Sequence, residues 1–452
     1  MFFHFYFVGV LLCVVFFYLF YFLITIAVFA VFFEYLQNCK FSNNCTKLVK
    51  IKAVCFCIFS FSKSLFWLFK KASNILNLID NLMELLKSPP TTSKPVIKCL
   101  NKSFLTCYKT FGLKRISYVE WVREDKPVPT SAKHPPHLIL CHHALSWNAM
   151  SFEHLAHKLL TKHIDRLPRF EFYFFAQFVS YLKKKTNTRI LAMDAIGRGD
   201  SDWLPETNGE MYGYHLYIPD SVTWISRIVG PEVESIDPEK VKITWIGTSM
   251  GGIVGMLLAC DPKNTPLSKL ILNDIGPFVS KQVTQNIGNY LSKVPTMNSI
   301  DDVIKVNKKR YELKIRYSEK WPQTHFSEED WHWLARVMSQ EEKREGKSEE
   351  NDKKTESEKD KNSKYIFRYD PNIVRNFDKV DNDWDFFNLF DLIKIPTLLI
   401  RGAKSEIVSK ELMEKMKVRG PKPKCVELQN FGHAPMLLTD DEIDPIIAFI
   451  EA

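Results

Sequence analysis

One stretch of the chain joins a buried strand pattern to residues that can perform nucleophilic chemistry. The apolar residues 241–247 run into Gly247-Thr-Ser-Met-Gly-Gly252, which places Ser249 in the spacing Gly-x-Ser-x-Gly. A serine hydroxyl is a weak nucleophile in water. A sharp strand-to-helix turn exposes its Oγ and directs the next amide and the helix N-terminus at the developing charge. We expect Gly247 and Gly251 there because a Cβ would collide with a neighbouring strand or helix. The stretch predicts a nucleophile elbow built on Ser249.

Two further residues with acid–base chemistry follow Ser249 in chain order. His433 lies in the loop after the last predicted strand, and we expect it to accept the Ser249 proton. A carboxylate must then hold the imidazole tautomer and stabilise the cation that forms. We favour Glu406, which follows the strand pattern of residues 395–400, and keep Asp274 as the alternative acid. The order serine, acid, histidine is that of a hydrolase triad.

The loop after residues 137–141 carries the second half of the predicted oxyanion site. The amide of Met250, directly after the nucleophile, is one expected donor, and the amide of Leu145 is the other. His142 and His143 in the same loop are possible metal ligands. Adjacent histidines point in different directions, however, and no carboxylate partner is evident. We therefore expect no metal at these histidines.

Strand patterns alternate with helix-length segments along most of the chain, at residues 116–122, 137–141, 189–194, 241–247, 267–273, 395–402, 404–409 and 424–428. This alternation predicts an α/β fold with a mostly parallel sheet flanked by helices. Catalytic residues in such sheets collect at the carboxyl ends of the strands. We expect Arg198 and Asp200 to tie the loop after Asp194 rather than contact substrate.

The pattern of the sequence divides the sheet-forming region into two parts. Residues 96–276 and 392–452 form the predicted core, and residues 277–391 lack strong strands but contain helical patterns and several Trp and Phe residues. Such an insertion predicts a helical cap over the site. Within the cap, residues 340–364 are almost entirely charged or polar with nearly balanced signs. That segment cannot bury a core, so we predict a disordered surface loop.

The N-terminal region has a different character. Residues 2–33 are almost unbroken apolar residues, long enough to span a bilayer, and no basic region precedes them. We predict an uncleaved transmembrane helix within residues 1–52, whose lysine-containing flank places the catalytic domain in the cytosol. Residues 53–95 are predicted to be an interfacial or amphipathic segment and a Pro-rich linker, in which residues 53–69 lie in the interface or form a second span.

The net charge indicates which classes of partner the protein has, and the cysteine content indicates its compartment. The net charge of +9 has no dominant basic block, which fits proximity to an anionic membrane surface and argues against nucleic acid. The ten cysteines are scattered without zinc-site spacing, which is typical of reduced thiols in a cytosol-facing domain.

Together these motifs resemble the cap-bearing serine hydrolases of the α/β-hydrolase fold family. The resemblance runs from about residue 116 to the end and is carried by Gly197-Arg-Gly-Asp-Ser-Asp-Trp203, Gly247-Thr-Ser-Met-Gly-Gly252, Leu272-Asn-Asp-Ile-Gly-Pro277, Tyr369-Asp-Pro371, Leu399-Ile-Arg-Gly-Ala403 and Gly432-His-Ala-Pro435. It implies Ser249 as nucleophile, His433 as base, Glu406 as acid and no cofactor. Two positions depart from the family pattern, since His143-Ala144 replaces His-Gly and Glu406 replaces Asp.

Two functions follow as hypotheses. The first is a membrane-anchored serine hydrolase that cleaves a lipophilic carboxylic ester, such as a lipid or acyl ester, through an acyl-enzyme. The triad motivates the chemistry, and the anchor and aromatic-rich cap motivate the substrate. The alternative is a catalytically silent α/β-hydrolase fold that serves as a membrane-complex subunit or binding module, which His143-Ala144 and the charged insert favour.

Overall fold

The computed structural model describes residues 96–124, 137–165, 188–233, 241–263, 265–315, 326–342 and 364–452, all within the unit Lys94–Ala452. The predicted anchor and linker, residues 1–52 and 53–95, lie outside the described residues, as does most of the charged insert 340–364. No helix in the described ranges is long and apolar enough to span a bilayer.

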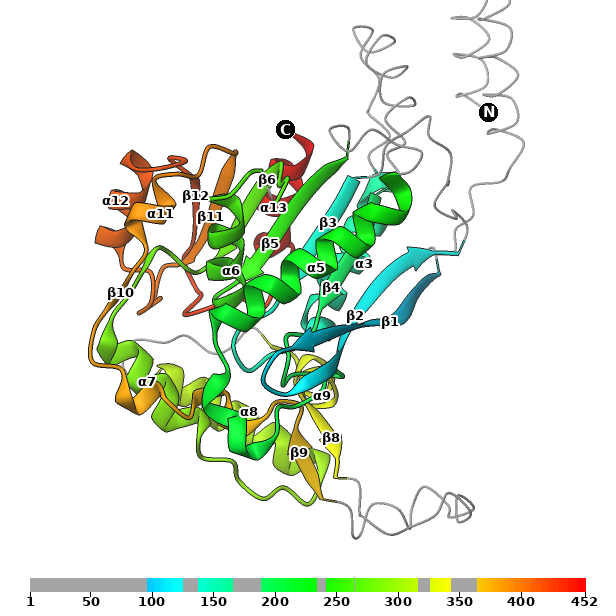
Figure 1. Ribbon diagram of the computed structural model, residues 1–452, viewed down its shortest axis with the longest axis vertical. Coiled ribbons are helices and arrows are strands. Elements are labelled where there is room, and N and C mark those ends of the chain that lie inside the picture. Colours follow the sequence, from blue (N-terminus) through cyan, green and yellow to red (C-terminus); the bar gives the residue numbers. More distant parts are fainter. Residues whose placement is uncertain are drawn as a thin grey trace, which may run out of the picture. The chain divides into compact units, whose positions relative to one another are not determined.

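The centre of the unit is one eight-stranded sheet (Figure 1). Its order is β1 (Ile97–Tyr108), β2 (Gly112–Arg123), β4 (Thr188–Met193), β3 (His137–His142), β5 (Lys242–Thr248), β6 (Lys269–Asn273), β11 (Thr397–Gly402) and β12 (Lys424–Leu428). β4 and the five strands after it in this order pair in parallel, whereas β1–β2 and β2–β4 pair antiparallel. The predicted α/β fold with a mostly parallel sheet is confirmed. The strand expected at residues 404–409 is a turn instead.

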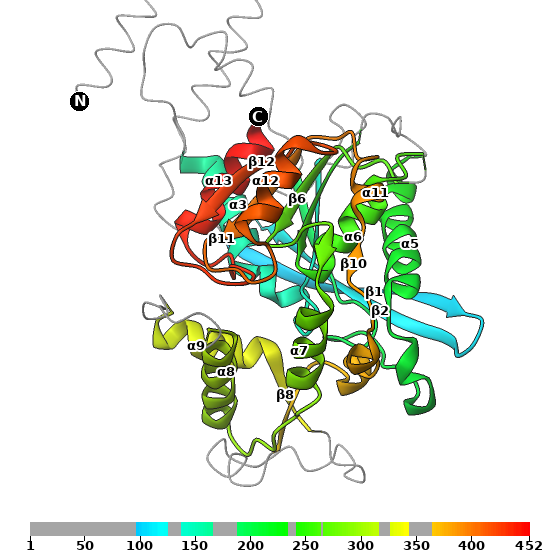
Figure 2. The ribbon, with the colours of Figure 1, turned by 90° about the vertical axis from the view of Figure 1, so that its left-hand side faces the viewer.

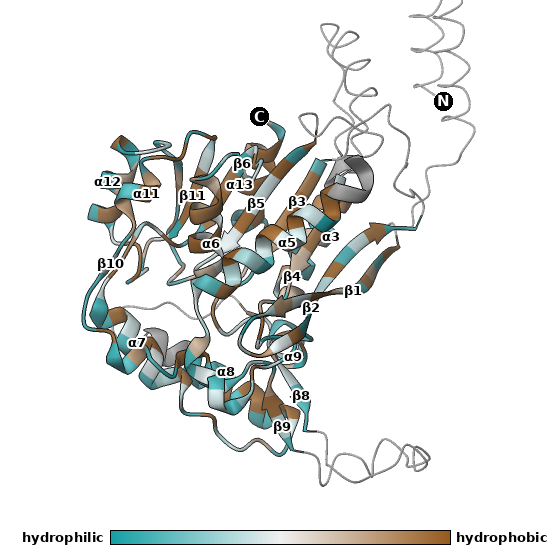
Figure 3. Cartoon of the chain, viewed as in Figure 1, coloured by the Kyte–Doolittle hydropathy of each residue, from teal (hydrophilic) through white to brown (hydrophobic). Residues whose placement is uncertain are grey.

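Both faces of this sheet are buried. Side chains alternate along a strand, so Leu138 and Leu140 of β3 join one apolar cluster while Ile139 and Cys141 join another. The first cluster is covered by α5 (Tyr214–Val233), α6 (Met250–Ala259) and α12 (Lys410–Val418), and the second by α3 (Glu153–Asp165) and α13 (Asp440–Glu451). Figure 3 shows the apolar colouring of the central strands. This burial on both faces explains the near-continuous apolar runs that mark these strands in the sequence.

The chain between β6 and β11 forms the predicted cap region. It contains β7 (Phe278–Val279), α7 (Lys281–Leu291), α8 (Ile300–Ile315), α9 (Glu328–Met338), the hairpin β8 (Ser339–Glu341) and β9 (Tyr365–Phe367), two 3-10 turns η6 (Pro371–Val374) and η7 (Phe377–Lys379), β10 (Trp384–Asp385) and α11 (Phe387–Phe390). Ser280 caps α7, and Ser327 with Asp330 forms a capping box at α9. Figure 2 shows α7, α8 and α9 grouped apart from the sheet, on the side of its carboxyl ends.

Candidate active site

Ser249 lies at the junction of β5 and α6 in a strained backbone conformation, with φ 49° and ψ −112°. The turn is tight on both sides of the serine. A Cβ at Gly247 would lie 2.2 Å from the Gly251 carbonyl oxygen, and one at Gly251 would lie 2.0 Å from the His142 carbonyl oxygen. The predicted need for both glycines is therefore confirmed. The Ser249 amide donates to the Asn273 carbonyl of the neighbouring strand, which holds the elbow against β6.

His433 lies in the loop after β12 and faces the serine. Its Nε2 is 3.1 Å from Ser249 Oγ, and its Nδ1 is 2.7 Å from Oδ2 of Asp274. Nδ1 is the donor to the carboxylate and Nε2 the acceptor of the serine proton in the tautomer that supports nucleophilic attack. The structure therefore brings Ser249, His433 and Asp274 into one hydrogen-bonded series.

Asp274 follows β6 and is fully buried, with a left-handed φ of 54°. Besides His433, three donors surround its carboxylate. Oδ1 accepts the Gly402 amide at 3.0 Å, while Oδ2 accepts the Ser405 hydroxyl at 2.6 Å and the Ala434 amide at 3.1 Å. Burying a carboxylate is costly unless hydrogen bonds satisfy it. These donors, from loops after β11 and β12, meet that need and aim the carboxylate at the imidazole.

Glu406, the preferred acid in the sequence interpretation, occupies a different place. It is exposed in the turn after β11, and no hydrogen bond within the described residues joins it to His433. Partial burial raises the pKa of Glu406, and nearby His433 opposes this shift. The preference for Glu406 is thus corrected in favour of the alternative acid, Asp274. The reason is that β6 and β11 are neighbours, so the turn after β11 places Ser405, not Glu406, against the carboxylate.

Of the two predicted oxyanion donors, the Met250 amide directly follows the serine, and the Leu145 amide stays a prediction. Met250 is the first residue of α6, where helical amides lack an intrahelical acceptor. The Gly251 amide donates to the His143 carbonyl and the Gly252 amide to that of Ser249, whereas the Met250 amide has no such acceptor among the described residues. Its N–H remains available beside Ser249, which an oxyanion donor requires.

Arg198 connects the loops that present these donors. Its side chain is fully buried, with Nε donating to the Leu145 carbonyl at 3.0 Å and Nη1 to the Tyr217 hydroxyl at 2.9 Å. Nη2 lies 3.7 Å from the Met250 sulfur, and Nη1 also bonds the Ile196 carbonyl. The expectation that Arg198 ties the loop after Asp194 is confirmed. Its link to both Leu145 and Met250 was not expected, because no local pattern couples residues so distant in sequence.

Asp200 was also expected to tie the loop after Asp194. Its Oδ1 lies 2.5 Å from Nη2 of Arg368, a residue just after β9 of the cap region. The amide of Asp200 also donates to Oδ2 of Asp194 at 2.9 Å. Asp200 therefore ties the loop after β4 to the cap region as well as to its own strand end.

The adjacent histidines stabilise the loop before Leu145. His143 Nε2 accepts the Ala195 amide at 2.9 Å, so its Nδ1 must carry the proton donated to the Ala144 carbonyl at 2.7 Å. Burial lowers the pKa of His142 to about 4 and holds that of His143 well below the usual value. Both rings are neutral near pH 7. No group of three or more His, Cys, Asp or Glu side chains in the described ranges is arranged to hold a metal.

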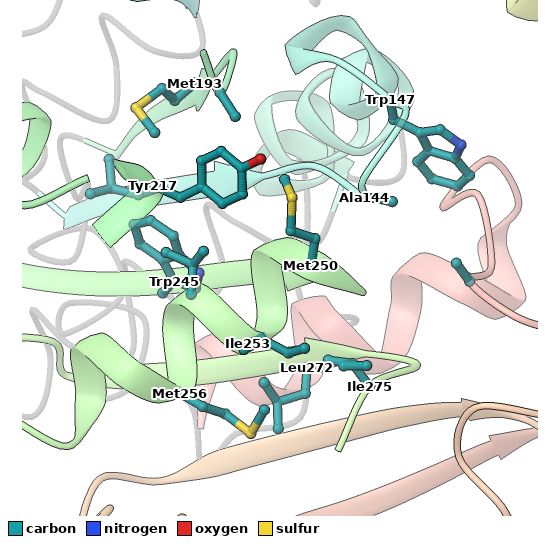
Figure 4. Packing of buried hydrophobic residues seen from close by; sticks show 14 of the residues in the cluster. Ala144, Trp147, Met193, Tyr217, Trp245, Met250, Ile253, Met256, Leu272 and Ile275 are labelled. Carbon is teal, nitrogen blue, oxygen red and sulfur yellow. The ribbon is translucent and has the colours of Figure 1, made fainter. Parts of the chain in front are cut away.

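Ala144, which replaces the glycine of the related family pattern, fits without backbone strain. The non-glycine residues with positive φ in the described part are Ser249, Asp274, Lys422, Ala434 and Leu437, so Ala144 needs no left-handed conformation. Its side chain is buried in the cluster that also contains Trp147, Tyr217 and Met250 (Figure 4). The extra Cβ therefore packs against the site instead of distorting the loop.

A pocket is lined by residues of both the core and the cap region, and the triad residues are not among the lining residues in the described part. Its core wall is formed by Ser146 and Trp147, which follow Leu145, and by Met436, three residues after His433. The wall from the cap region consists of apolar and polar side chains, Tyr290, Asn307, Arg310, Leu334, Met338, Phe367 and Tyr369. Asn307 and Arg310 were missed in the sequence, because two polar residues three apart on a helix also describe an ordinary solvated face.

Comparison with known proteins agrees with this geometry. The model of the alpha/beta hydrolase fold family matches residues 138–439, more than half of the chain. The chain is similar to a 3-hydroxybutyrate-oligomer hydrolase from Cupriavidus necator, with 27% identity over 349 residues that cover 75% of this chain and 94% of the relative.

The chain is also similar to solved structures of hydrolases. A candidate hydrolase from Rickettsia typhi is 26% identical with a TM-score of 0.53, and the match covers 79% of this chain and 99% of the other. An alpha/beta hydrolase from Novosphingobium aromaticivorans shares the fold at 22% identity and a TM-score of 0.53, with 78% and 98% covered. The family match, the sheet and the site together show that this chain belongs to the alpha/beta hydrolase fold family.

Proposed function

We propose that this hydrolase is a serine hydrolase that cleaves carboxylic esters through an acyl-enzyme. The observation that carries the proposal is the hydrogen-bonded series from Ser249 Oγ through His433 to buried Asp274. A nucleophile, a base and a group that orients the base are the three parts that acyl transfer needs.

The reaction proceeds in two halves. Ser249 Oγ attacks the ester carbonyl carbon while His433 Nε2 takes the hydroxyl proton, and the amides of Met250 and Leu145 bind the oxyanion. The C–O bond to the alcohol then breaks, and the alcohol leaves with the proton from His433. Water repeats the attack on the acyl-serine, so one ester and one water yield one acid and one alcohol. Asp274 stabilises the imidazolium in both halves.

The substrate class is proposed from the pocket and from the relative. Trp147, Leu334, Met338 and Phe367 give the pocket a largely apolar lining, which supports a lipophilic acyl or alcohol part. The relative from Cupriavidus necator is named for hydrolysis of 3-hydroxybutyrate oligomers. We therefore propose an ester, including an oligoester of a hydroxy acid, as the substrate.

A membrane location is proposed from the sequence alone. The apolar residues 2–33 and the lysines that follow them support a single transmembrane anchor with the catalytic domain in the cytosol. Ester substrates that partition into lipid would then reach the site from the membrane surface.

An active-site probe tests the chemistry directly. A fluorophosphonate should label the wild-type protein and fail to label Ser249→Ala, while Ser226→Ala, at an exposed serine on α5, should label normally. The wild type and Ser226→Ala should also hydrolyse 4-nitrophenyl esters of graded chain length, and Ser249→Ala should not. A folded wild-type protein that is not labelled would contradict the proposal.

The alternative function, a catalytically silent binding module, makes the opposite prediction. It requires neither a labelled serine nor a loss of cellular role in Ser249→Ala. The continuous triad and the unstrained Ala144 favour the enzyme, since a silent module has no need for either.

A further inference from the structure

We propose that Arg310 and Asn307 of the cap helix α8 bind a carboxylate carried by the substrate, so that the enzyme prefers esters with a free carboxylate over neutral ones. This inference rests on the proposed ester hydrolase function and names a feature of its substrate. The two residues lie three apart on α8, which places them on the same face of the helix, and both line the pocket formed by the core and the cap region.

Arg310 brings a positive charge into the pocket without a matching negative charge. Its guanidinium carbon lies 4.0 Å from the centre of the Phe367 ring and 5.3 Å from that of Tyr290. Nη2 donates to the Lys293 carbonyl at 3.2 Å. No carboxylate of the described residues lies within ion-pair distance of Arg310. Aromatic faces, one carbonyl and the Tyr369 hydroxyl position the guanidinium, and the remaining N–H donors of its fork are left for a ligand.

Asn307 adds an unused donor next to this charge. Its Nδ2 is buried and has no hydrogen-bond partner. A buried donor without an acceptor is costly, so such groups in native proteins call for an explanation. An oxygen atom of a bound ligand would supply the missing acceptor. A carboxylate has two oxygens, which suits one donor from Asn307 and one from Arg310.

The rest of the pocket favours the same ligand. Of the pocket-lining residues in the described part, Arg310 alone carries a formal charge, and the others are apolar, aromatic or neutral polar. An anion held there meets no carboxylate in the lining. The opposite wall contains Ser146, Trp147 and Met436, which lie next to Leu145 and His433 in sequence. The inference places the ester part of the same molecule on the side of the pocket formed by Ser146, Trp147 and Met436, whose chain segments lead to Leu145 and His433.

The chemical class that fits is an ester bearing a free carboxylate, as in a short oligoester of a hydroxy acid. The matched probes are the dimer of 3-hydroxybutyrate with its free carboxylate and the same dimer closed as a primary amide. Both contain the same internal ester bond, and only one carries the charge. The ratio of their kcat/KM values, measured by chromatography of the released products on the full chain, reports the preference.

We expect the wild-type enzyme to prefer the free acid, and Arg310→Met to lower this preference by about 10- to 100-fold, mainly through KM of the acid. Asn307→Asp, which is nearly isosteric, should lower it as well because the added carboxylate neutralises the cation. Arg310→Lys should retain part of the preference. Lys309→Met, at an exposed neighbour on the same helix, should leave it unchanged and is the control for overall charge.

Three results would overturn the inference: equal kcat/KM for acid and amide in the wild type, the same loss in Lys309→Met as in Arg310→Met, or equal losses for both substrates in Arg310→Met. The last result would mean that Arg310 only supports the packing of the cap. A wild type that hydrolyses 4-nitrophenyl esters but cleaves neither dimer would also overturn the inference. Failure of the folded wild type to react with the fluorophosphonate would instead contradict the ester hydrolase function, and the inference with it.

Discussion

Oδ2 of Asp274 lies 2.7 Å from Nδ1 of His433, although 159 residues separate the two in sequence. The contact forms because β6 and β12 both flank β11, so the loops after these strands meet at one edge of the sheet. Glu406, which follows β11 itself, is exposed and has no hydrogen bond to His433 among the described residues. The acid of the site is therefore set by strand order.

Replacing Asp274 should remove most of the activity. In Asp274→Asn the side-chain amide can present an N–H to Nδ1, which favours the wrong imidazole tautomer, and kcat should fall by roughly 10⁴-fold. Glu406→Gln is the matched control and should change kcat by less than about threefold, because Glu406 makes no hydrogen bond to His433 among the described residues. Steady-state hydrolysis of a 4-nitrophenyl ester measures kcat of both variants. The reverse ranking would return the acid role to Glu406.

Arg198 should act as a positioning residue for the oxyanion site. Arg198→Lys keeps the charge but loses the planar fork that reaches both the Leu145 carbonyl and Met250. We expect kcat to fall about 10- to 100-fold with little change in KM. The affinity for a trifluoromethyl ketone, which forms a tetrahedral adduct with serine, should fall in parallel with kcat/KM. A loss of folding stability with unchanged affinity for this inhibitor would assign Arg198 a structural role alone.

Two glycine substitutions should differ sharply in their effect on activity. Gly251→Ala places a Cβ 2.0 Å from the His142 carbonyl, so the elbow and the oxyanion loop must move apart, costing about 1–3 kcal/mol of stability and most of the activity. Gly112→Ala, with φ 72° and open space around it, should cost only about 1–2 kcal/mol through its backbone conformation and leave kcat unchanged. Urea unfolding and ester hydrolysis compare the two. An active Gly251→Ala enzyme would argue against this tight contact.

Asp220 should make folding stability depend on pH. Burial raises its pKa to about 6, and only Oδ2, held by Tyr108, has a hydrogen-bond partner, whereas Oδ1 has none. In the unfolded chain the pKa is about 3.9, so the folded state binds more protons between these values. The stability linked to protonated Asp220 is thus present below about pH 4 and lost as pH rises through about 6.

Asp220→Asn removes this titration. The free energy of unfolding of the variant, relative to the wild type, should rise by about 2–3 kcal/mol between pH 4 and pH 8, since one pKa unit corresponds to about 1.4 kcal/mol. Urea titrations followed by tryptophan fluorescence at both pH values measure the difference. Asp381→Asn, at an exposed carboxylate, should show almost no such change. A flat difference for Asp220→Asn would mean that Asp220 is ionised in the folded protein at pH 4.

Local patterns in the sequence were sufficient for part of the site. The Gly-x-Ser-x-Gly spacing of residues 247–251 is typical of a strand-to-helix turn that leaves no room for a Cβ at either glycine. The placement of Ser249 and the need for Gly247 and Gly251 could therefore be predicted. The apolar runs of the central strands were equally clear, because β3, β5, β6 and β11 are buried on both faces along nearly their whole length.

The tertiary structure decided the features that depend on chain segments meeting across the fold. The choice of Asp274 over Glu406, the contact of Arg198 with Leu145 and Met250, and the placement of Arg310 and Asn307 in a pocket with core residues all join residues tens to hundreds of positions apart. Spacing along the chain carries no information about such contacts, since they follow from strand order and cap packing. The sequence by itself therefore determined the nucleophile and the fold class, and only the folded chain determined its acid and the charge in its pocket.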